Sequence, residues 1–162
     1  MSKSKKTRKN ALSGKMNRRL FLIDVENYCG KPILSEQDAL VAKMSFFEHF
    51  SPRENDLIVV GTSHTNNFFN VGMAWHGVRQ VLGIGHDGAD MALIKAAKDY
   101  RLNTFEEVVV LSGDGIFAET VEELALEGVI VAVVSSADRL SRRLVDVAPR
   151  IRVVAQPALK AA

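Results

Sequence analysis

Aspartates recur in this sequence shortly after apolar segments. Asp24 follows residues 20–23, Asp90 follows residues 78–82 after a glycine-rich stretch, and Asp114 follows residues 108–111. If parallel strands brought these residues to one edge of a sheet, the carboxylates would repel one another unless a cation neutralised them. Oxygen-only ligand sets select Mg²⁺ or Mn²⁺, and such a site can activate water against a phosphodiester.

Each aspartate taken alone has a simpler interpretation, because Asp is a common helix N-cap and turn residue. For Asp114 alone we favour that simpler role. The occurrence of all three aspartates at expected strand ends favours a shared metal site.

The glycine-rich stretch at residues 83–88 fits the dinucleotide-binding pattern, so a nucleotide cofactor is an alternative ligand. Two features oppose that alternative. Asp87 lies within the turn that would hold a pyrophosphate, and the stretch follows the third expected strand instead of the first. We favour flexible backbone near the acidic site as the role of these glycines.

Other residue types give weaker signals. Cys29 is the single cysteine, which excludes a disulfide framework and a thiolate zinc cluster. A buried or loop role for Cys29 is favoured over that of a thiol nucleophile. The four histidines show no paired metal-ligand spacing, although His64 and Asn66 fall on the expected functional edge.

The elements that must position these residues alternate along the chain. Apolar, β-rich runs predict strands, and helical patterns separate them. This alternation predicts an α/β fold of three layers, Rossmann-like, with a mainly parallel sheet of five or six strands. In the strand order 3-2-1-4-5, the strands that end at Asp24 and Asp114 are neighbours, and ligands bind at that edge. Strands are expected at residues 20–25, 56–61, 78–82, 108–111, 129–134 and 151–154, and helices at residues 35–50, 67–75, 89–100, 116–127 and 139–145.

The net charge of +2 conceals a basic N-terminus. The first 19 residues have no carboxylate, and small polar residues separate their cations, so residues 1–18 are predicted to be a disordered arm. Such an arm would bind nucleic-acid phosphates, although a solubilising tail is the alternative. The candidate RNA-binding cations are Lys3, Lys5, Lys6, Arg8, Lys9, Lys15, Arg18 and Arg19. A second group is interpreted as a solvated helix face: Arg139, Arg142, Arg143, Arg150 and Arg152.

Length and composition bound the remaining possibilities. The chain has 162 residues, 47% of them hydrophobic and 25% charged, which is typical of one globular domain. We assign residues 19–155 to that domain and residues 156–162 to a C-terminal tail. No apolar run is long enough to cross a bilayer, and no secretory signal is evident, so a cytoplasmic location without a membrane partner is expected. A homo-oligomer stays open.

At the aspartates the chain resembles the NYN branch of the PIN-like nucleases. That family carries Asp-x-x-Asn after its first strand, as do residues 24–27 here. Its Gly-x-Asp-x-x-Leu motif is similar to residues 88–93. Its Ser-Gly-Asp-x-Asp-Phe motif matches residues 112–117 except at Ile116, where the family has a second Asp. The resemblance spans roughly residues 19–135.

The resemblance implies a divalent-metal-dependent ribonuclease, an endonuclease that hydrolyses RNA phosphodiester bonds. It implies that Asp24, Asp90 and Asp114 are catalytic ligands of Mg²⁺ or Mn²⁺. It also implies that Asn27 is a catalytic group that orients a ligand or phosphate, and that Ser112 donates a hydrogen bond to a carboxylate.

The departure at Ile116 removes one acid from the family pattern. Asp87 is the candidate auxiliary acid that would replace it. The alternative function is a catalytically weak RNA-binding or regulatory module on the same fold.

Overall fold

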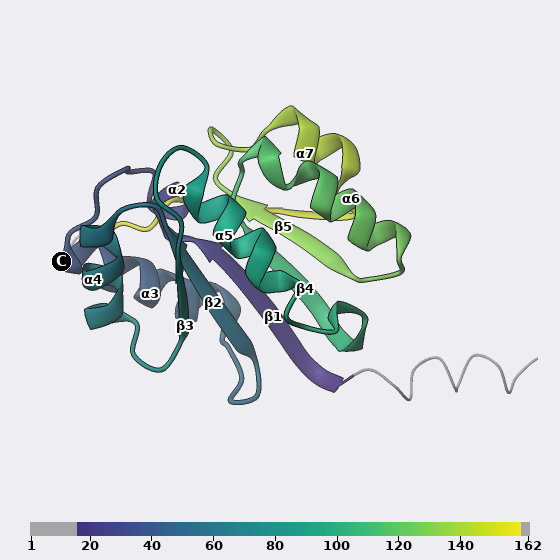
Figure 1. The fold of residues 1–162 in the computed structure, drawn as a ribbon, viewed down its shortest axis with the longest axis horizontal. Helices are drawn as coiled ribbons and strands as arrows, with labels where there is room; N and C mark the ends of the chain where they lie inside the picture. Colours follow the sequence, from purple (N-terminus) through teal and green to yellow (C-terminus); the bar gives the residue numbers. More distant parts are fainter. Residues whose placement is uncertain (1–15, 160–162) are drawn as a thin grey trace, which may run out of the picture.

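The middle layer of the molecule is one parallel sheet of six strands, in the order β3-β2-β1-β4-β5-β6 (Figure 1). The structure is a computed structural model that describes residues 16–159. The predicted α/β class, the three Rossmann-like layers and the adjacency of the first and fourth strands are confirmed. The strands are β1 (Met16–Asp24), β2 (Leu57–Thr62), β3 (Arg79–Leu82), β4 (Phe105–Leu111), β5 (Val131–Ser135) and β6 (Arg150–Val153).

Helices cover both faces of the sheet (Figure 1). Phe21 and Ile23 of β1 pack into the apolar cluster with α3 and α4, whereas Leu20 and Leu22 face the cluster with α5, α6 and α7. This alternation follows from the two-residue period of a strand. None of the described helices is long and apolar enough to cross a membrane. The helices are α2 (Val25–Cys29), α3 (Glu36–Phe50), α4 (Thr65–Ala74), α5 (Gly88–Ala97), α6 (Ala118–Leu126) and α7 (Arg142–Val147), with 3-10 turns η1 (Leu102–Thr104) and η2 (Gly115–Phe117).

The start of α3 is the clearest local signal in the sequence. The Ser35 hydroxyl accepts the Asp38 backbone N–H at 3.0 Å, and the Asp38 carboxylate accepts the Ser35 N–H at 3.0 Å. This reciprocal capping box satisfies two N–H groups at the helix start, so the predicted cap is confirmed.

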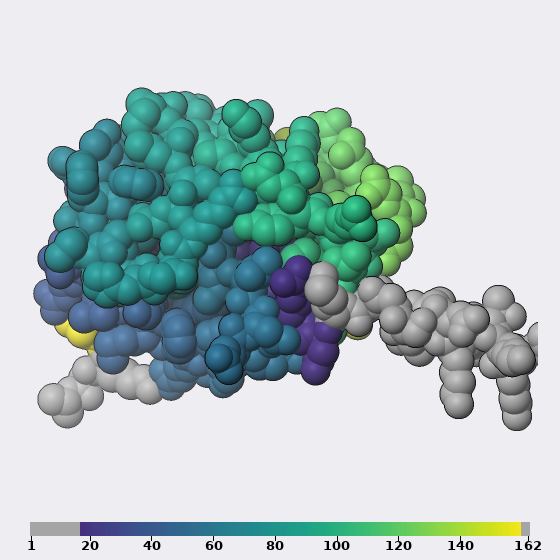
Figure 2. Space-filling view, turned by 60° about the horizontal axis from the view of Figure 1, so that its bottom comes forward, coloured from purple at the N-terminus to yellow at the C-terminus, as the bar shows by residue number. Residues whose placement is uncertain are grey.

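The sheet begins earlier than the sequence pattern predicted. Because β1 starts at Met16, Arg18 and Arg19 belong to the sheet and not to a disordered arm. The purple start of β1 lies at the surface between the turn before β2 and the segment before β4 (Figure 2). The Arg18 guanidinium lies 4.8 Å above the centre of the Phe105 ring. The other predicted RNA-binding cations lie outside the described residues: Lys3, Lys5, Lys6, Arg8, Lys9 and Lys15.

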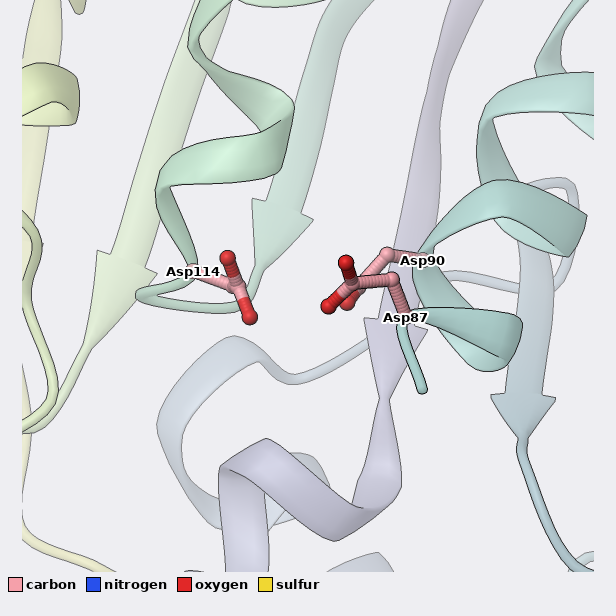
Figure 3. A group of neighbouring side chains, drawn as sticks. All are labelled: Asp87, Asp90 and Asp114. Atoms are coloured by element: carbon pink, nitrogen blue, oxygen red, sulfur yellow. The ribbon is translucent and has the colours of Figure 1, made fainter. Parts of the chain in front are cut away.

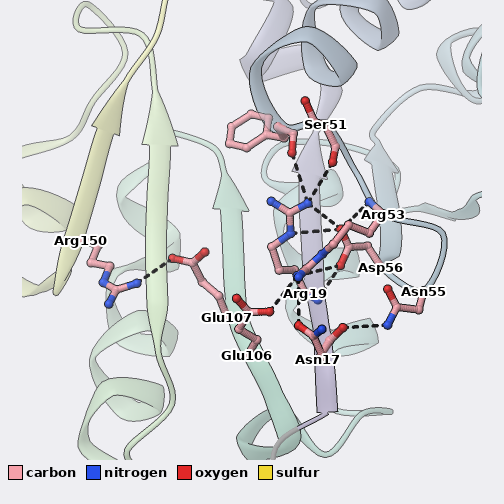
Figure 4. Close-up of polar contacts among 10 residues, drawn as sticks. Asn17, Arg19, Ser51, Arg53, Asn55, Asp56, Glu106, Glu107 and Arg150 are labelled. Atoms are coloured by element: carbon pink, nitrogen blue, oxygen red, sulfur yellow. Dashed lines mark hydrogen bonds and ion pairs between the residues drawn. The ribbon is translucent and has the colours of Figure 1, made fainter.

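Arg19 and Asp56 close the amino-terminal end of the sheet (Figure 4). The Arg19 guanidinium donates to Asp56 at 2.7 and 3.0 Å, and also to the carbonyl oxygens of Phe50 and Ser51. The Asp56 side chain is fully buried. Burial alone would raise its pKa, but hydrogen bonds from Arg19 and Arg53 lower the pKa of Asp56 below its ordinary value. Arg19 therefore has a structural partner at the end of the sheet opposite the aspartates.

Candidate metal centre

The carboxyl ends of the strands open onto a cavity of about 570 Å³. Its walls come from the end of β1, the loop before α5, the loop after β4 and the loop before α4. Such crevices at the carboxyl edge are where open α/β sheets bind ligands. All of the aspartates singled out by the sequence line it: Asp24, Asp87, Asp90 and Asp114.

Three carboxylates converge in this cavity (Figure 3). Asp87, Asp90 and Asp114 each offer an oxygen, and these three oxygens lie within 4.8 Å of one another. Asp90 is only 4% exposed, and its Oδ1 is buried without a hydrogen-bond partner. A buried carboxylate oxygen without a partner is costly, so this group has the ligand type, the spacing and the unmet demand that a bound cation would satisfy.

Asp24 lies next to Asp90 but is not one of these three carboxylates. It caps α2, where its Oδ1 accepts the Asn27 backbone N–H at 3.1 Å. Its carboxyl group also shares a hydrogen bond with Asp90. Asp90 and Asp114 are thus brought together as predicted, but among the residues that the structure describes Asp87 takes the third position expected for Asp24.

Burial and mutual repulsion control the charge of the acidic residues. Burial raises the pKa of Asp24 to about 6, although hydrogen bonds from Asp90 and the Asn27 backbone oppose the rise. Burial, the hydrogen bond to Asp24 and the charges of the neighbouring aspartates raise the pKa of Asp90 to about 9. At neutral pH and without a cation, Asp90 therefore keeps its proton and donates a hydrogen bond through it to the carboxylate of Asp24.

The glycines before α5 carry Asp87 into the site. A Cβ on Gly88 would collide with the carbonyl oxygen of Gly83, and a Cβ on Gly83 would collide with that of Gly88. The loop between them also needs a positive φ at Gly85 (96°) and at Asp87 (57°). Because the backbone at Gly83 touches the backbone at Gly88, only glycine fits at these two positions, and the tight loop between them places Asp87 beside Asp90.

Asn27 and Ser112 act on the backbone of the loop after β4. Asn27 Oδ1 accepts the Gly113 N–H at 3.0 Å, and the Ser112 hydroxyl accepts the Asp114 N–H at 3.2 Å. The role implied for Ser112, donation to a carboxylate, is therefore not the contact observed. Both side chains fix the loop from which Asp114 projects.

Ile116 faces away from the acidic cavity. Its side chain is half-buried against the apolar cluster beneath α6. Its backbone N–H donates to the Asp114 carboxylate at 3.0 Å, which caps η2. The simpler role considered for Asp114, that of a cap, is thus present together with its place in the acidic group.

Glu26 is a site residue that the sequence analysis missed. Its carboxylate accepts the Ser63 N–H at 2.9 Å, the Ser63 hydroxyl at 2.8 Å and the Asn67 amide at 2.6 Å. These bonds attach the loop before α4 to α2, and His64 in that loop lines the cavity. No spacing in the sequence points to Glu26, because its partners lie about 40 residues away.

The surroundings of Cys29 disfavour a role as a nucleophile. It is buried, and burial raises the pKa of its thiol to about 12, so almost no thiolate forms at neutral pH. The expectation of a small buried cysteine is confirmed.

Comparisons with known proteins support the fold alone. No family model matches the chain, and no curated protein matches it. A crystal structure of a protein of unknown function from Vibrio parahaemolyticus superposes with a TM-score of 0.56 at 16% identity. The match covers 97% of this chain and 98% of that one. This similarity establishes that another protein has the same arrangement of helices and strands.

Proposed function

We propose that this protein is a ribonuclease of the NYN and PIN-like type that hydrolyses RNA phosphodiester bonds with Mg²⁺ or Mn²⁺. The observation that carries the proposal is the buried Asp90, which has an oxygen without a hydrogen-bond partner and offers a carboxylate oxygen within 4.8 Å of those of Asp87 and Asp114. The group has only oxygen ligands, which favours hard divalent cations over zinc or copper.

The residues fit a cation on electrostatic grounds. Without one, burial and then the neighbouring carboxylates raise the pKa of Asp90, so that it keeps a proton. A divalent ion would displace that proton and neutralise the group, and the freed Asp90 oxygen would become a ligand. Asp87, Asp90 and Asp114 would hold the ion directly, and Asp24 would support Asp90 from behind.

The chemistry divides between the ion and the chain. When bound, Mg²⁺ or Mn²⁺ would polarise a phosphoryl oxygen of the RNA and make a water molecule more acidic. The chain holds its carboxylates in place through the contacts of Asn27 and Ser112 with the loop after β4. Asp24 would position Asp90 through the hydrogen bond that their carboxyl groups share.

The nucleotide-cofactor alternative has less support. In the dinucleotide-binding pattern the glycines leave backbone space for a pyrophosphate. Here the space beside the middle glycine, Gly85, is open, but the loop turns the carboxyl group of Asp87 toward the cavity. A bound pyrophosphate would meet a carboxylate at that place.

A second candidate is an RNA-binding module without strong cleavage, and Ile116 favours it. The side chain at this position packs on apolar residues, so the fourth acid of the family pattern has no replacement there. Under our proposal Asp87 supplies the missing carboxylate from another loop.

Cleavage of labelled single-stranded and structured RNAs in Mg²⁺, Mn²⁺ or EDTA tests the proposal. We expect metal-dependent cleavage by the wild type and a loss of more than about 100-fold in Asp90→Asn, since even outer-shell partners of a metal contribute 10–100-fold. The matched control is Asp146→Asn, an exposed carboxylate on α7. Cleavage that persists in EDTA, or equal activity in both variants, would refute the nuclease assignment; RNA binding without cleavage would favour the second candidate.

A further inference from the structure

We propose that Arg139 and Arg143 bind consecutive phosphates of the RNA chain beside the acidic group, so that the RNA leaves the cavity over η2 and the start of α7. This inference rests on the proposed function, since it concerns the substrate of the same site. It gives these two arginines, which the sequence analysis assigned to a solvated helix face, a specific role.

Arg139 lies at the mouth of the cavity in a fixed position. It is exposed and lines the cavity, and its guanidinium donates to the carbonyl oxygen of Gly30 at 2.9 Å. Its backbone presses on the acidic loop, because a Cβ on Gly113 would collide with the Arg139 carbonyl oxygen. The Ser141 N–H also donates to the Gly113 carbonyl at 2.8 Å. The position of Arg139 is therefore coupled to that of the loop that carries Asp114.

Arg143 lies beside the same loop, next to Gly115. A Cβ on Gly115 would lie 3.4 Å from Arg143 Cδ and 2.8 Å from the Ser141 hydroxyl. The Arg143 side chain is exposed at the first turn of α7. Arg139 and Arg143 therefore lie beside the two glycines that bracket Asp114, Gly113 and Gly115.

Several neighbouring cations form ion pairs, whereas these two arginines do not within the part of the chain that the structure describes. Arg142 pairs with Asp146, Arg150 pairs with Glu107, and Lys31, which also lines the cavity, pairs with Asp38 at 2.7 Å. Within residues 16–159 no carboxylate forms an ion pair with Arg139 or Arg143, although Arg139 lines the same cavity as the aspartates.

If neutralising the aspartates were their role, the two arginines would form ion pairs with them. Within the described residues, the fold instead leaves these arginines and the carboxylates of Asp87 and Asp114 without ion pairs between them. A phosphodiester chain with a divalent ion satisfies both groups, because the ion meets the carboxylates and the phosphates meet the guanidinium groups.

The test is the salt dependence of RNA binding, measured without metal so that it does not depend on cleavage. Fluorescence anisotropy would follow a labelled single-stranded RNA in EDTA, from 50 to 200 mM salt, with the full chain. Each lost phosphate contact should reduce the slope of log K against log salt by about 0.7, which at 0.1 M salt is about a five-fold loss of affinity. We expect this loss in Arg139→Gln and in Arg143→Gln.

Three further variants serve as controls. Arg150→Gln removes the same charge at the opposite end of the sheet and should leave the slope unchanged (Figure 4). Lys31→Gln should lower affinity less than Arg139→Gln, because its ammonium group already pairs with Asp38. Arg139→Lys should keep most of the slope, which separates lost charge from a disturbed loop; a melting curve would verify that each variant is folded.

The outcomes separate this inference from the proposed function. Equal losses in Arg139→Gln and Arg150→Gln, or no RNA binding by the wild type, would overturn the phosphate path. If the arginine variants lost as much affinity for a mononucleotide as for the RNA, the phosphate path would also be overturned, because a single phosphate would then account for the contacts of both arginines. Binding that depends on both arginines without any metal-dependent cleavage would support the path and refute the nuclease assignment.

Discussion

Replacement of Asp90 by Asn should stabilise the metal-free protein, and the gain should grow with pH. Asn keeps the shape of the carboxyl group and can donate to Asp24 as the protonated Asp90 does, but it has no proton to lose. In the wild type the folded pKa of Asp90 is raised from 3.8 to about 9 by burial and by its acidic neighbours. Between these two values the folded chain retains a proton that the unfolded chain releases.

The sign and size of the effect follow from that proton. A group with a raised folded pKa stabilises the fold below its unfolded pKa, and this contribution is lost as the pH rises toward the folded pKa. One retained proton changes the free energy of unfolding by about 1.4 kcal/mol per pH unit, so the wild type loses up to about 3 kcal/mol from pH 6 to pH 8 relative to Asp90→Asn. For a chain of this size that corresponds to up to about 6–12 °C in melting temperature.

Urea denaturation in EDTA at pH 6, 7 and 8 would measure the difference. Asp146→Asn removes an exposed carboxylate and should follow the wild type at each pH. Saturating Mn²⁺ should stabilise the wild type and not Asp90→Asn, because only the wild type keeps the ligand. A difference between wild type and Asp90→Asn that stays constant from pH 6 to pH 8 would show that Asp90 is not the proton-holding residue described above.

Three other changes have distinct expected outcomes. Asp114→Asn should remove the Mn²⁺-dependent rise in melting temperature but keep the fold, because the amide oxygen of Asn can still cap η2. If Mn²⁺ raised the melting temperature of the variant as much as that of the wild type, Asp114 would be a cap only. Asp56→Ala should lower the free energy of unfolding by about 3–5 kcal/mol in urea denaturation, because it leaves the buried guanidinium of Arg19 without its carboxylate partner. Mn²⁺ should still stabilise this variant. Gly88→Ala should lower the free energy of unfolding by about 1–3 kcal/mol in the same assay, because the new Cβ collides with Gly83 and displaces the loop. The displaced loop should also abolish the Mn²⁺ response, so unchanged Mn²⁺ binding would contradict the role given to that contact.

The parts of the fold that the sequence predicted are those with local or periodic signals. The continuous Val, Ile and Leu runs predicted the buried central strands, and Ser35 with Asp38 predicted the start of α3. The early start of β1 was missed because its polar first residues are held by distant partners: Asn17 contacts Arg53 at 3.0 Å and Asn55 at 2.7 Å. The helix α2 was missed because its five residues are too few to show a helical period.

The candidate site divides in the same way. Strand order, a global property that the alternation of strands and helices predicts, placed the strand ends at Asp24 and Asp114 side by side, and the glycine-rich stretch placed Asp90 after a neighbouring strand. The position of Asp87 depends on the left-handed backbone at that residue and on the contact between Gly83 and Gly88. That contact is specified by three-dimensional packing, and a glycine pattern in sequence fits a phosphate-binding loop equally well.

The hydrogen bond from the Gly113 N–H to Asn27 joins residues 86 positions apart and has a kinetic consequence. Since β1 pairs with both β2 and β4, the central strand cannot complete its ladder until a segment of chain from beyond residue 104 has docked. Loop closure over such separations makes folding slow compared with that of helical proteins. The acidic group draws on the start of α5 and on the loop after β4, so no fragment lacking β4 should assemble it. A response to Mn²⁺ during refolding would then report the arrival of the whole central sheet, and not the formation of any single helix or hairpin.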